Sequence, residues 1–555
     1  MREKPAIVQS DGTILLFVDS PEFKEAREKI SVFAELIKAP DYVHTYRITP
    51  ISLWNAAAMG TSAGEVKEAL REFSSYKVPK NILEQAEEYI GRYGKVKMLR
   101  EKGEIILLLE DSAVGELILS DKKASTYIEE KISPVKFRVK KYARGHLKLF
   151  LVKMGYPVED WAGYSQGTPY NFTLKNLKLR PYQMEAIEAF YAGGSEKGGS
   201  GVVVLPCGAG KTIVGIGVME KLQTETLIIV TSTVAARQWK EELLIWTNIP
   251  PEDIGEYSGE VKEIKPITIA TYNILIYRKG KNFSHLGIFD AKNWGLIIYD
   301  EVHLLPAPVF KITAEIQAKR RLGLSATLVR EDGREDEIFA LIGPKKYDAP
   351  WKTFEENGWI ASAICFEVRV PMPQKFKLRY MRASKRKKFT IASTNPEKIT
   401  ALRKILSFHR KDKILIIGQF ISQLREIART INAPLITGTT PNSEREKLYS
   451  DFREGKISTL VVSKVANFAI NLPSANVAIE VSGTFGSRQE EAQRLGRILR
   501  PKSEGNAYFY AIVSGETIDE EYSAKRQIFL TEQGYKYTII KLEDLDEKSP
   551  ISRVL

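Results

Sequence analysis

The segment that ends at Thr212 has the residue types and spacing of a loop that binds phosphate. The β-forming run 202–205 leads into Gly-Ala-Gly-Lys-Thr, and an apolar, helix-like stretch follows. Glycines allow backbone N–H groups to approach phosphate oxygens, and the start of a helix adds a favourable dipole. In this arrangement a lysine reaches the β- and γ-phosphates of a nucleotide, and a threonine hydroxyl binds Mg²⁺. The candidate residues are Gly208, Ala209, Gly210, Lys211 and Thr212.

This loop is a variant of the common pattern, because Leu205 stands where the pattern usually begins with a glycine. An incidental Gly-Lys-Thr turn is therefore the alternative interpretation of the segment. Cys207 lies inside the loop, where we interpret it as a small residue that fills space.

A pair of carboxylates follows a second apolar run. Residues 294–299 have the pattern of a buried strand, and Asp300-Glu301-Val302-His303 come directly after it. A carboxylate at the carboxyl end of a strand lies at the same sheet edge as a phosphate loop, so Asp300 is placed to hold Mg²⁺. Glu301 is then placed to orient and deprotonate the attacking water. The alternative is a solvated polar turn.

Three further segments carry groups that suit nucleotide chemistry. Arg497 and Arg500 are three residues apart, share one helix face, and are candidates to stabilise charge on the transferred γ-phosphoryl group. A basic surface helix is the alternative for this segment. Ser325-Ala326-Thr327 ends another apolar run. The amide of Gln183 both donates and accepts hydrogen bonds, which suits recognition of adenine.

The elements around these groups predict an α/β protein with parallel sheets. Buried-strand patterns alternate with helical patterns, both around the phosphate loop and again in residues 413–418, 459–463 and 475–481. The chain length of 555 residues suggests three or four domains. A Gly- and Ser-rich linker is expected at 161–171, and a hinge between two α/β domains at 343–351.

The amino-terminal part predicts smaller α+β modules. A strand pair at 7–20 precedes a helix whose apolar face extends to Ile37. Three helices and a hairpin in residues 46–109 fit either a winged helix or a small helical bundle, and 96–100 fits a basic wing strand or an edge strand. Further along, the pattern predicts strands at 116–119, 135–139 and 147–151, and a helix at 125–132.

Taken in order, these motifs resemble superfamily 2 helicases. The Asp-Glu-Val-His form and an Arg-Glu-Asp triplet shortly after Ser-Ala-Thr make the chain similar to the xeroderma pigmentosum group B (XPB) family, in its bacterial or archaeal branch. The motifs that carry the resemblance lie between residues 172 and 500. It implies an ATP- and Mg²⁺-dependent 3′-to-5′ DNA helicase or translocase, stimulated by DNA and working in DNA repair. A duplex translocase or a DNA-binding scaffold is the alternative.

The resemblance also implies four domains and a role for each site residue. The domains are a module at 1–100, a damage-recognition-like domain at 101–165, and two RecA-like motor domains at 172–345 and 346–555. Binding of the nucleotide is implied for Arg180, Gln183 and Gln493. Coupling of ATP to DNA is implied for His303, Ser325, Thr327 and Asn471. Contacts with DNA are implied for Arg237, Thr271, Arg330, Glu331 and Asp332. Asn471 departs from the family, which usually has an aspartate there.

Composition agrees with an acidic partner. The net charge is +13, and residues 371–390 contain eight basic residues and no acidic residue. Phe376, Tyr380 and Phe389 interleave with these cations, which suits contacts to bases or sugars. The cations are Lys375, Lys377, Arg379, Arg382, Lys385, Arg386, Lys387 and Lys388. A thumb-like insert is the feature that the resemblance implies here, and a solvated charge run is the alternative.

Other functional classes receive less support. No apolar run approaches the ~18 residues needed to cross a bilayer, and two cysteines supply neither a disulfide framework nor a zinc cluster. We therefore expect a cytoplasmic protein that binds DNA, with a nuclease or another repair protein as a possible partner. A small-molecule kinase is the rival enzyme class, but it leaves the arginine pair and the basic segment unexplained.

Overall fold

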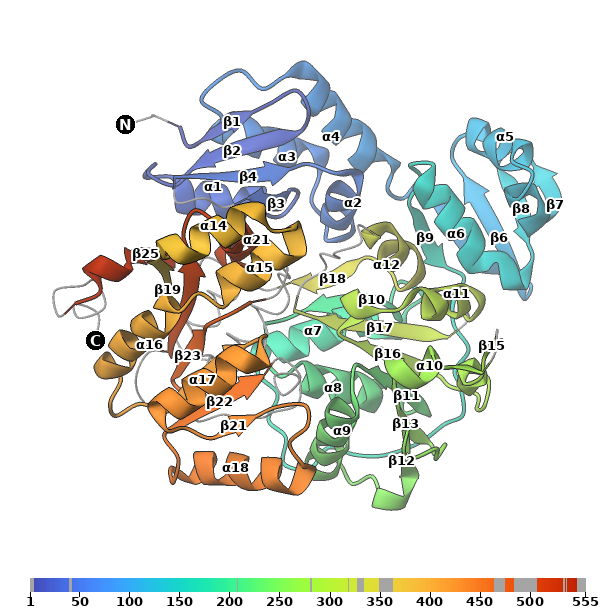
Figure 1. The fold of residues 1–555 in the computed structure, drawn as a ribbon. Coiled ribbons are helices and arrows are strands. Elements are labelled where there is room, and N and C mark those ends of the chain that lie inside the picture. The colour runs from blue at the N-terminus through green and yellow to red at the C-terminus, as the bar shows by residue number, and fades with distance from the viewer. Residues whose placement is uncertain are drawn as a thin grey trace. The chain divides into compact units, whose positions relative to one another are not determined.

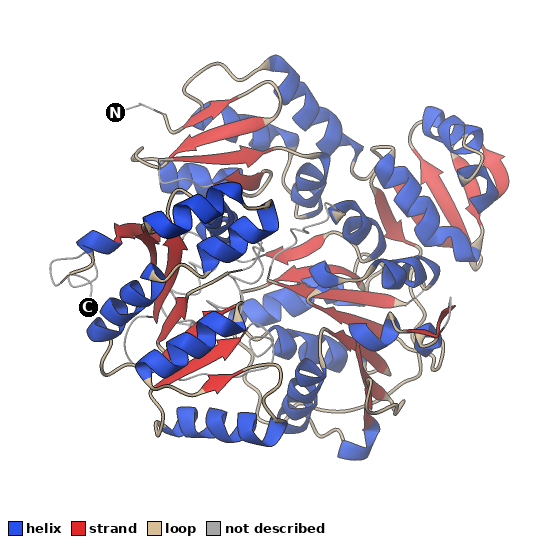
Figure 2. Ribbon diagram, viewed as in Figure 1, coloured by secondary structure: helices blue, strands red, loops and turns tan. Residues whose placement is uncertain are grey.

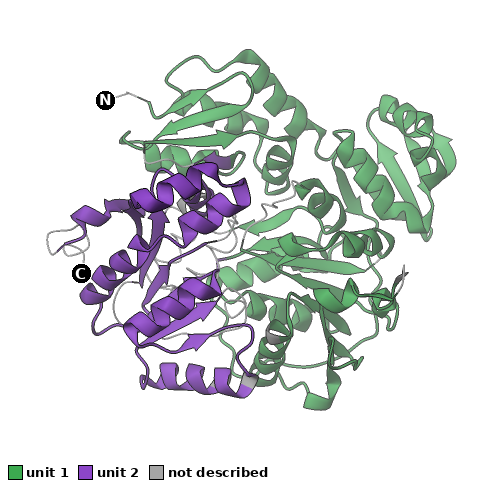
Figure 3. Ribbon diagram, in the orientation of Figure 1, with its two compact units in different colours: residues 1–35, 42–205, 210–349 green, residues 36–41, 206–209, 350–555 purple. Residues whose placement is uncertain are grey.

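The fold is described from a computed structural model (Figures 1 and 2). The structure describes residues 4–38, 42–206, 208–279, 282–317, 319–326, 334–348, 363–463, 475–483, 507–532, 535 and 537–546. The chain divides into two compact units (Figure 3). Unit 1 comprises residues 1–35, 42–205 and 210–349, and unit 2 comprises residues 36–41, 206–209 and 350–555.

Unit 1 is built around a seven-stranded sheet in which every neighbouring pair is parallel. Its order is β12-β13-β11-β16-β17-β10-β18. The strands are β10 (Ser200–Val204), β11 (Thr226–Val230), β12 (Ile254–Tyr257), β13 (Ile267–Thr271), β16 (Leu296–Asp300), β17 (Arg320–Ser325) and β18 (Lys345–Asp348). Because helices cover both faces of such a sheet, its central strands are nearly continuous apolar runs (Figure 2).

The helices of this domain precede β10 or lie between later strands of the sheet. They are α7 (Pro181–Tyr191), α8 (Lys211–Leu222), α9 (Thr233–Trp246), α10 (Tyr272–Leu275), α11 (Ala307–Glu315) and α12 (Glu335–Leu341). Strand β17 lies between β10 and β16, with Val204 opposite Ser325 and Asp300 opposite Leu324. The carboxyl ends of these three strands therefore meet at one edge of the sheet.

Unit 2 contains a second seven-stranded sheet, again with all neighbouring strands parallel. Its order is β21-β22-β20-β23-β24-β19-β25. The strands are β19 (Ala363–Val370), β20 (Ile414–Gly418), β21 (Leu435–Ile436), β22 (Thr459–Ser463), β23 (Val477–Glu480), β24 (Ala507–Ser514) and β25 (Tyr537–Lys541). The predicted class, two RecA-like parallel-sheet domains preceded by α+β modules, is confirmed.

Helices α14 (Gln374–Arg382) and α15 (Lys385–Ser393) follow β19 and carry the basic segment. The other helices of unit 2 are α16 (Glu397–Phe408), α17 (Ile421–Ile431), α18 (Asn442–Glu454) and α21 (Ile518–Glu532). The predicted hinge at 343–351 is wrong for residues 345–348, because these form β18, which pairs with β10 at the edge of the first sheet. Residues 349–351 lie outside the described part of the chain.

The amino-terminal region holds two smaller sheets. The first has the order β1-β2-β4-β3 and consists of β1 (Ala6–Val8), β2 (Thr13–Phe17), β3 (Glu35–Lys38) and β4 (Val43–Arg47). Helix α1 (Phe23–Ile30) ends before Ile37, which lies in β3, so the prediction that this helix extends to Ile37 is wrong. Three helices follow, α2 (Pro50–Ala58), α3 (Ala63–Phe73) and α4 (Lys80–Arg92).

The second small sheet has five strands in the order β7-β8-β6-β5-β9. They are β5 (Val96–Glu101), β6 (Glu104–Leu109), β7 (Ile128–Ser133), β8 (Lys136–Val139) and β9 (Val158–Trp161). The hairpin β5–β6, which a winged helix would use as its wing, is thus part of this sheet. Strand β5 lies between β6 and β9, so it is not an edge strand.

Three segments of this module differ from their predicted structure. Residues 116–119 and 147–151 were predicted as strands but lie in helices α5 (Ser112–Ser120) and α6 (Arg144–Lys153). Residues 125–132 were predicted as a helix but form a short 3₁₀ turn and then strand β7. Short apolar runs do not distinguish buried helices from buried strands, and here tertiary packing decides.

The segment 161–171, expected as a linker, is held against the first sheet. The Thr224 hydroxyl donates to the carbonyl oxygens of Gln166 and Thr168, at 2.9 and 3.0 Å. Gly167 has a φ of +76°, and a Cβ added there would lie 2.3 Å from the Cα of Gly295. Only glycine allows this approach. The segment is therefore an ordered part of unit 1.

Candidate nucleotide-binding site

The phosphate loop connects β10 to α8. Gly208 and Gly210 have φ values of +85° and +79°, in the left-handed region that favours glycine. A Cβ on Gly210 would lie 2.7 Å from the Gln183 Nε2 atom, so this position has no room for a larger residue. Helix α8 begins at Lys211, and Thr212 follows in its first turn. The loop thus presents backbone N–H groups at a helix start, which is the geometry that binds phosphate.

The Lys211 ammonium lies beside one of the predicted catalytic carboxylates. Its Nζ atom is 3.5 Å from Oε1 of Glu301, and the two side chains are only 12% and 16% exposed. A phosphate bound in the loop would compete with this carboxylate for the lysine. The pair therefore brings together the phosphate-binding and water-activating groups that the sequence predicts.

Asp300 ends strand β16 and has two donors on its carboxylate. Trp239 on α9 donates its indole N–H to Oδ2 at 2.9 Å, and the backbone N–H of Glu301 donates to Oδ1 at 3.1 Å. Burial raises the pKa of Asp300 to about 6, and the neighbouring Glu301 charge adds to this effect, although Trp239 and Lys211 act against it. A buried carboxylate with a raised pKa is a group whose charge lacks a full counter-charge.

Glu301 has the opposite character. Burial acts to raise its pKa, but Lys211 and His303 outweigh burial, so the pKa of Glu301 lies below its ordinary value. Its backbone has a φ of +50°, which is strained for a residue with a side chain. The two adjacent carboxyl groups are thus driven apart in pKa, a pattern typical of sites where such groups have different tasks.

His303 and Ser325 connect this loop to the central strand β17. The Nδ1 atom of His303 is 2.6 Å from the Ser325 hydroxyl and 3.5 Å from Oε2 of Glu301. Both residues are buried. A movement of β17 would therefore be transmitted through the imidazole to Glu301, which is compatible with the predicted coupling role of both residues.

Gln183 and Arg180 lie at the start of α7. The side-chain carbonyl of Gln183 accepts from the backbone N–H of Arg180 at 2.9 Å and caps the helix. This leaves the amide Nε2 side facing Gly210 of the phosphate loop. Gln183 is thus placed at the loop, while recognition of adenine by this residue and by Arg180 stays a prediction.

The residues that would hold a divalent cation are Thr212 and Asp300. The raised pKa of Asp300 fits a position next to a cation, because a bound positive charge would stabilise the ionised form. Among the described residues, no group of three or more His, Cys, Asp or Glu side chains forms a metal site.

Two of the predicted DNA contacts lie in the described part of unit 1. Arg237 on α9 is 51% exposed and lies 3.9 Å from Glu260, so it remains accessible to a ligand. Thr271 is buried and ends β13, where its hydroxyl caps α10. The structure thus gives Thr271 a role in placing the segment that follows it, and its contact with DNA stays a prediction.

The basic segment of unit 2 is a helical hairpin. Lys375, Lys377, Arg379, Arg386 and Lys387 are exposed, and Lys388 is half-buried, with its ammonium 5.4 Å from the centre of the Tyr380 ring. The expectation that the aromatic residues face bases is wrong for Phe389, which is buried and packs against Tyr522 on α21. The Tyr380 hydroxyl accepts from the backbone N–H of Ile518, so Tyr380 also anchors the hairpin.

Several predicted site residues lie outside the described part of the chain. They are Thr327, Arg330, Glu331, Asp332, Asn471, Gln493, Arg497 and Arg500. Their roles stay predictions.

Sequence reasoning missed two residues that hold Asp300. Trp239 donates to its carboxylate, and the Tyr272 hydroxyl donates to its backbone carbonyl at 3.0 Å. Gly215 on α8 makes room for the indole, because a Cβ there would lie 2.5 Å from the Trp239 ring. The available signal was weak, since it consisted of single aromatic residues in the segments that follow β11 and β13.

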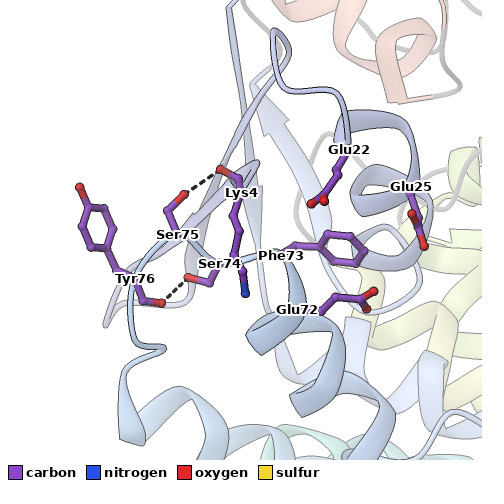
Figure 4. A pocket seen from close by; sticks show the side chains of 8 residues that line it. All are labelled: Lys4, Glu22, Glu25, Glu72, Phe73, Ser74, Ser75 and Tyr76. Atoms are coloured by element: carbon purple, nitrogen blue, oxygen red, sulfur yellow. Dashed lines mark hydrogen bonds between the residues drawn. The ribbon is translucent and has the colours of Figure 1, made fainter. Parts of the chain in front are cut away.

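The pocket shown in Figure 4 lies elsewhere, in the amino-terminal module. It has a volume of about 570 Å³, and its lining includes Lys4, Glu22, Glu25 and Glu72. Lys29 bridges Glu25 and Glu72, at 3.3 and 3.0 Å. None of the predicted nucleotide-site residues lines this pocket, and its acidic walls do not suit a phosphate ligand. Within the described residues, no helix has the length and apolar character that crossing a membrane requires.

The chain matches three models of known protein families. Residues 354–552 match the family model described as ERCC3/RAD25/XPB C-terminal helicase. Residues 6–133 match a helicase conserved C-terminal domain, and residues 176–330 match the type III restriction enzyme res subunit.

Similar full-length proteins carry the same family name. A Kineococcus radiotolerans protein named DNA 3′-5′ helicase XPB is 51% identical over 554 residues, 99% of each chain. A Mycobacterium tuberculosis protein of the same name is 51% identical over 98% of this chain and 99% of its own. A Saccharomyces cerevisiae TFIIH helicase/translocase subunit, XPB/SSL2, is 32% identical over 96% of this chain and 72% of its own. The resemblance predicted from the motifs is confirmed, and the chain belongs to the XPB family of helicases.

Proposed function

We propose that this chain hydrolyses ATP to move along DNA in the 3′-to-5′ direction and to separate its strands. The observation that carries the proposal is the largely buried group of Lys211, Asp300 and Glu301 at the carboxyl edge of a RecA-like sheet. It occurs in a chain that aligns over 99% of its length with a protein named DNA 3′-5′ helicase XPB. A small-molecule kinase would not account for that alignment.

The residues at the carboxyl edge of the first sheet divide the chemistry between them. The Gly208–Thr212 loop and Lys211 bind the phosphates of ATP, and Thr212 and Asp300 hold Mg²⁺, which neutralises charge on the phosphates when it is bound. Glu301, whose pKa is lowered, is ionised at neutral pH and accepts a proton from the attacking water. Competition of the phosphates for Lys211 releases Glu301 for this task. Turnover thus depends on nucleotide first separating the Lys211–Glu301 pair.

The second motor domain supplies the remaining groups of the proposed ATPase site. Arg497 and Arg500 stabilise charge on the γ-phosphoryl group, and Gln493 contacts the nucleotide. Closing and opening of the two domains then moves DNA-binding surfaces relative to each other. The α14–α15 hairpin is one such proposed surface, because its exposed cations suit the DNA backbone. DNA repair is the proposed setting, and a nuclease or another repair protein is the proposed partner class.

The direct test compares the wild type with Lys211→Ala in three assays. We expect wild-type ATPase activity to rise on addition of DNA, and the variant to lose roughly 100-fold or more of that activity. Strand displacement and triplex displacement, measured side by side, separate a helicase from a translocase that pumps intact duplex. ATPase activity that does not respond to DNA, or DNA movement that survives in the variant, would contradict the proposal.

A further inference from the structure

A short hairpin follows Thr271 in unit 1 and has no role in the site described above. Its strands are β14 (Arg278–Lys279) and β15 (Asn282–Phe283), which pair in antiparallel register. Figure 1 labels β15 next to α10, the helical turn that leads into the hairpin from β13. Because β13 ends at the same sheet edge as β16, the hairpin projects from the edge that carries the catalytic carboxylates.

The charge of this segment is one-sided. Residues 272–289 contain Arg278, Lys279 and Lys281 and no aspartate or glutamate. Arg278 and Lys279 are both exposed. Over the described ranges, no carboxylate forms an ion pair with either side chain, and the guanidinium of Arg278 lies 4.6 Å from the centre of the Phe283 ring. Two exposed cations that form no ion pair within the described residues make a surface that attracts phosphate.

An aromatic side chain accompanies the cations. Tyr277 is 57% exposed, although its backbone is fixed by hydrogen bonds to Ile274 and Ser284. The base of the hairpin is stiffened by His285, whose Nδ1 is 2.8 Å from the Tyr257 hydroxyl and whose ring lies 6.0 Å from that of Tyr277. An exposed ring on a rigid support beside cations is the combination that binds unpaired bases together with their phosphates.

The hairpin is also connected to the catalytic site. Five residues before Tyr277, the hydroxyl of Tyr272 donates to the backbone carbonyl of Asp300 at 3.0 Å. Tyr272 is buried, so this bond is shielded from water. A displacement of the hairpin is therefore transmitted through the four-residue helix α10 to the residue that would hold the cation.

We propose that the β14–β15 hairpin binds single-stranded DNA through Tyr277, Arg278 and Lys279, and that Tyr272 transmits this binding to Asp300 as a positioning residue. The inference rests on the proposed helicase function and adds to it a specific DNA contact and its route to the ATP site. Neighbouring cations without an ion-pairing carboxylate favour a nucleic acid, because its backbone carries a negative charge at every nucleotide. A protein partner would offer acidic groups only at isolated points.

The first experiment measures DNA affinity in the full-length chain. Arg278→Glu with Lys279→Glu is expected to weaken binding of a fluorescent single strand about tenfold or more, and to reduce the slope of log affinity against log salt by about 1.4. Tyr277→Ala is expected to weaken it about fivefold or more, because a stacking surface is lost. A duplex of the same length is expected to respond less to Tyr277→Ala.

The matched control reverses two cations at the opposite edge of the same sheet. Lys175→Glu with Lys221→Glu makes the same change of net charge, and both lysines are exposed. Lys221 lies in the last turn of α8, and the backbone N–H of Lys175 bonds to the end of α9. We expect less than about a twofold change in affinity for this control, since its cations lie far from the carboxyl edge.

These measurements can overturn the proposal in three ways. Equal affinity of the hairpin variants and the wild type would show that the hairpin does not bind DNA. Equal losses in the hairpin and control variants would show an effect of net charge alone. Equal responses of single strand and duplex to Tyr277→Ala would exclude stacking of unpaired bases. If the double variant is unfolded by circular dichroism, Tyr277→Ala and Lys279→Ala decide the result.

The second experiment tests transmission to Asp300. Tyr272→Phe keeps the buried ring but removes the hydroxyl, and we expect the ratio of DNA-stimulated to DNA-free ATPase activity to fall roughly threefold or more. DNA affinity is expected to stay within about twofold. A purely structural effect would lower both rates by the same factor and leave the ratio unchanged, which would overturn the coupling. A wild type without DNA stimulation would instead contradict the proposed function as a whole.

Discussion

Asp300 and Asp160 are both largely buried carboxylates of unit 1, but they have opposite surroundings. The Asp160 carboxylate accepts from Arg144 at 2.6 Å and from Lys148 at 2.8 Å, and all three side chains are at most 6% exposed. Burial acts to raise the pKa of Asp160, but the two cations outweigh it and hold the pKa well below its ordinary value. The pKa of Asp300, in contrast, is raised to about 6 by burial and by Glu301.

The difference separates a structural carboxylate from a functional one. The Asp160 charge lies between two cations of α6, so the group holds α6 and β9 together within the small five-stranded module. Asp300 has an acidic neighbour where Asp160 has a second cation. The negative charge of Asp300 is therefore fully compensated only when a bound ligand supplies positive charge. Burial alone does not identify a site, whereas burial without a counter-charge does.

The largest expected effect concerns the carboxylate beside Asp300. Glu301→Gln keeps the size and polarity of the side chain but removes its ability to accept a proton, so we expect kcat for ATP hydrolysis to fall about 10²- to 10⁴-fold. ATP binding, measured by fluorescence titration, is expected to persist because the phosphate loop is intact. If the variant retains a tenth or more of the wild-type kcat, Glu301 is not the group that accepts the proton.

The next effect compares the two aspartates by the same substitution. Asp160→Asn leaves Arg144 and Lys148 buried without their charge partner, so we expect the free energy of unfolding to fall by about 3–5 kcal/mol. Asp300→Asn removes a desolvated charge but leaves one N–H donor without an acceptor, and these effects offset each other to within about 1–2 kcal/mol. ATPase activity is expected to be lost only in Asp300→Asn. Urea denaturation together with an ATPase assay measures both outcomes.

A fully apolar replacement serves as the control for the Asp160 network. Arg144→Met, Lys148→Met and Asp160→Leu together remove these three charges at once, and we expect stability within about 2 kcal/mol of the wild type. A loss as large as that of Asp160→Asn would mean that packing, rather than unpaired charge, explains the single variant. Equal destabilisation by Asp160→Asn and Asp300→Asn would remove the distinction between the two sites.

The smallest effect is a shift in pH dependence. Asp300 holds a cation only when ionised, so kcat/KM is expected to fall as the pH decreases through about 6, the pKa of this group. Trp239 donates a hydrogen bond to the carboxylate and lowers its pKa. Trp239→Phe is therefore expected to move the acidic limb of the pH profile to higher pH.

Trp246→Phe is the matched control for this shift. Trp246 lies on the same helix and also donates to a carboxylate, that of Glu242 at 2.7 Å, but at the far end of α9. Its removal is expected to leave the acidic limb in place. If the acidic limb of the pH profile moves equally in both variants, the shift comes from a change in helix α9 rather than from loss of the hydrogen bond to Asp300.

Much of the architecture was predictable because its signals are local. The parallel sheets follow from buried strands that alternate with helices, and this prediction is confirmed in both units. The small five-stranded module was predicted less well, since residues 116–119 and 147–151 are helical. A short apolar segment packs equally well as a strand or a helix, and only its neighbours in space select one of them.

The sequence by itself determined the groups that carry the chemistry: a glycine loop before Lys211, and two adjacent carboxylates after a buried strand. Each depends on residues next to one another in the chain, so pattern and spacing are sufficient to find them. Tertiary structure decided which carboxylate receives counter-charges, because folding places Arg144 and Lys148 against Asp160, whereas the side chain that donates to Asp300 is the neutral Trp239. A pKa depends on burial and on charges a few ångströms away, and folding brings these groups together from distant parts of the chain.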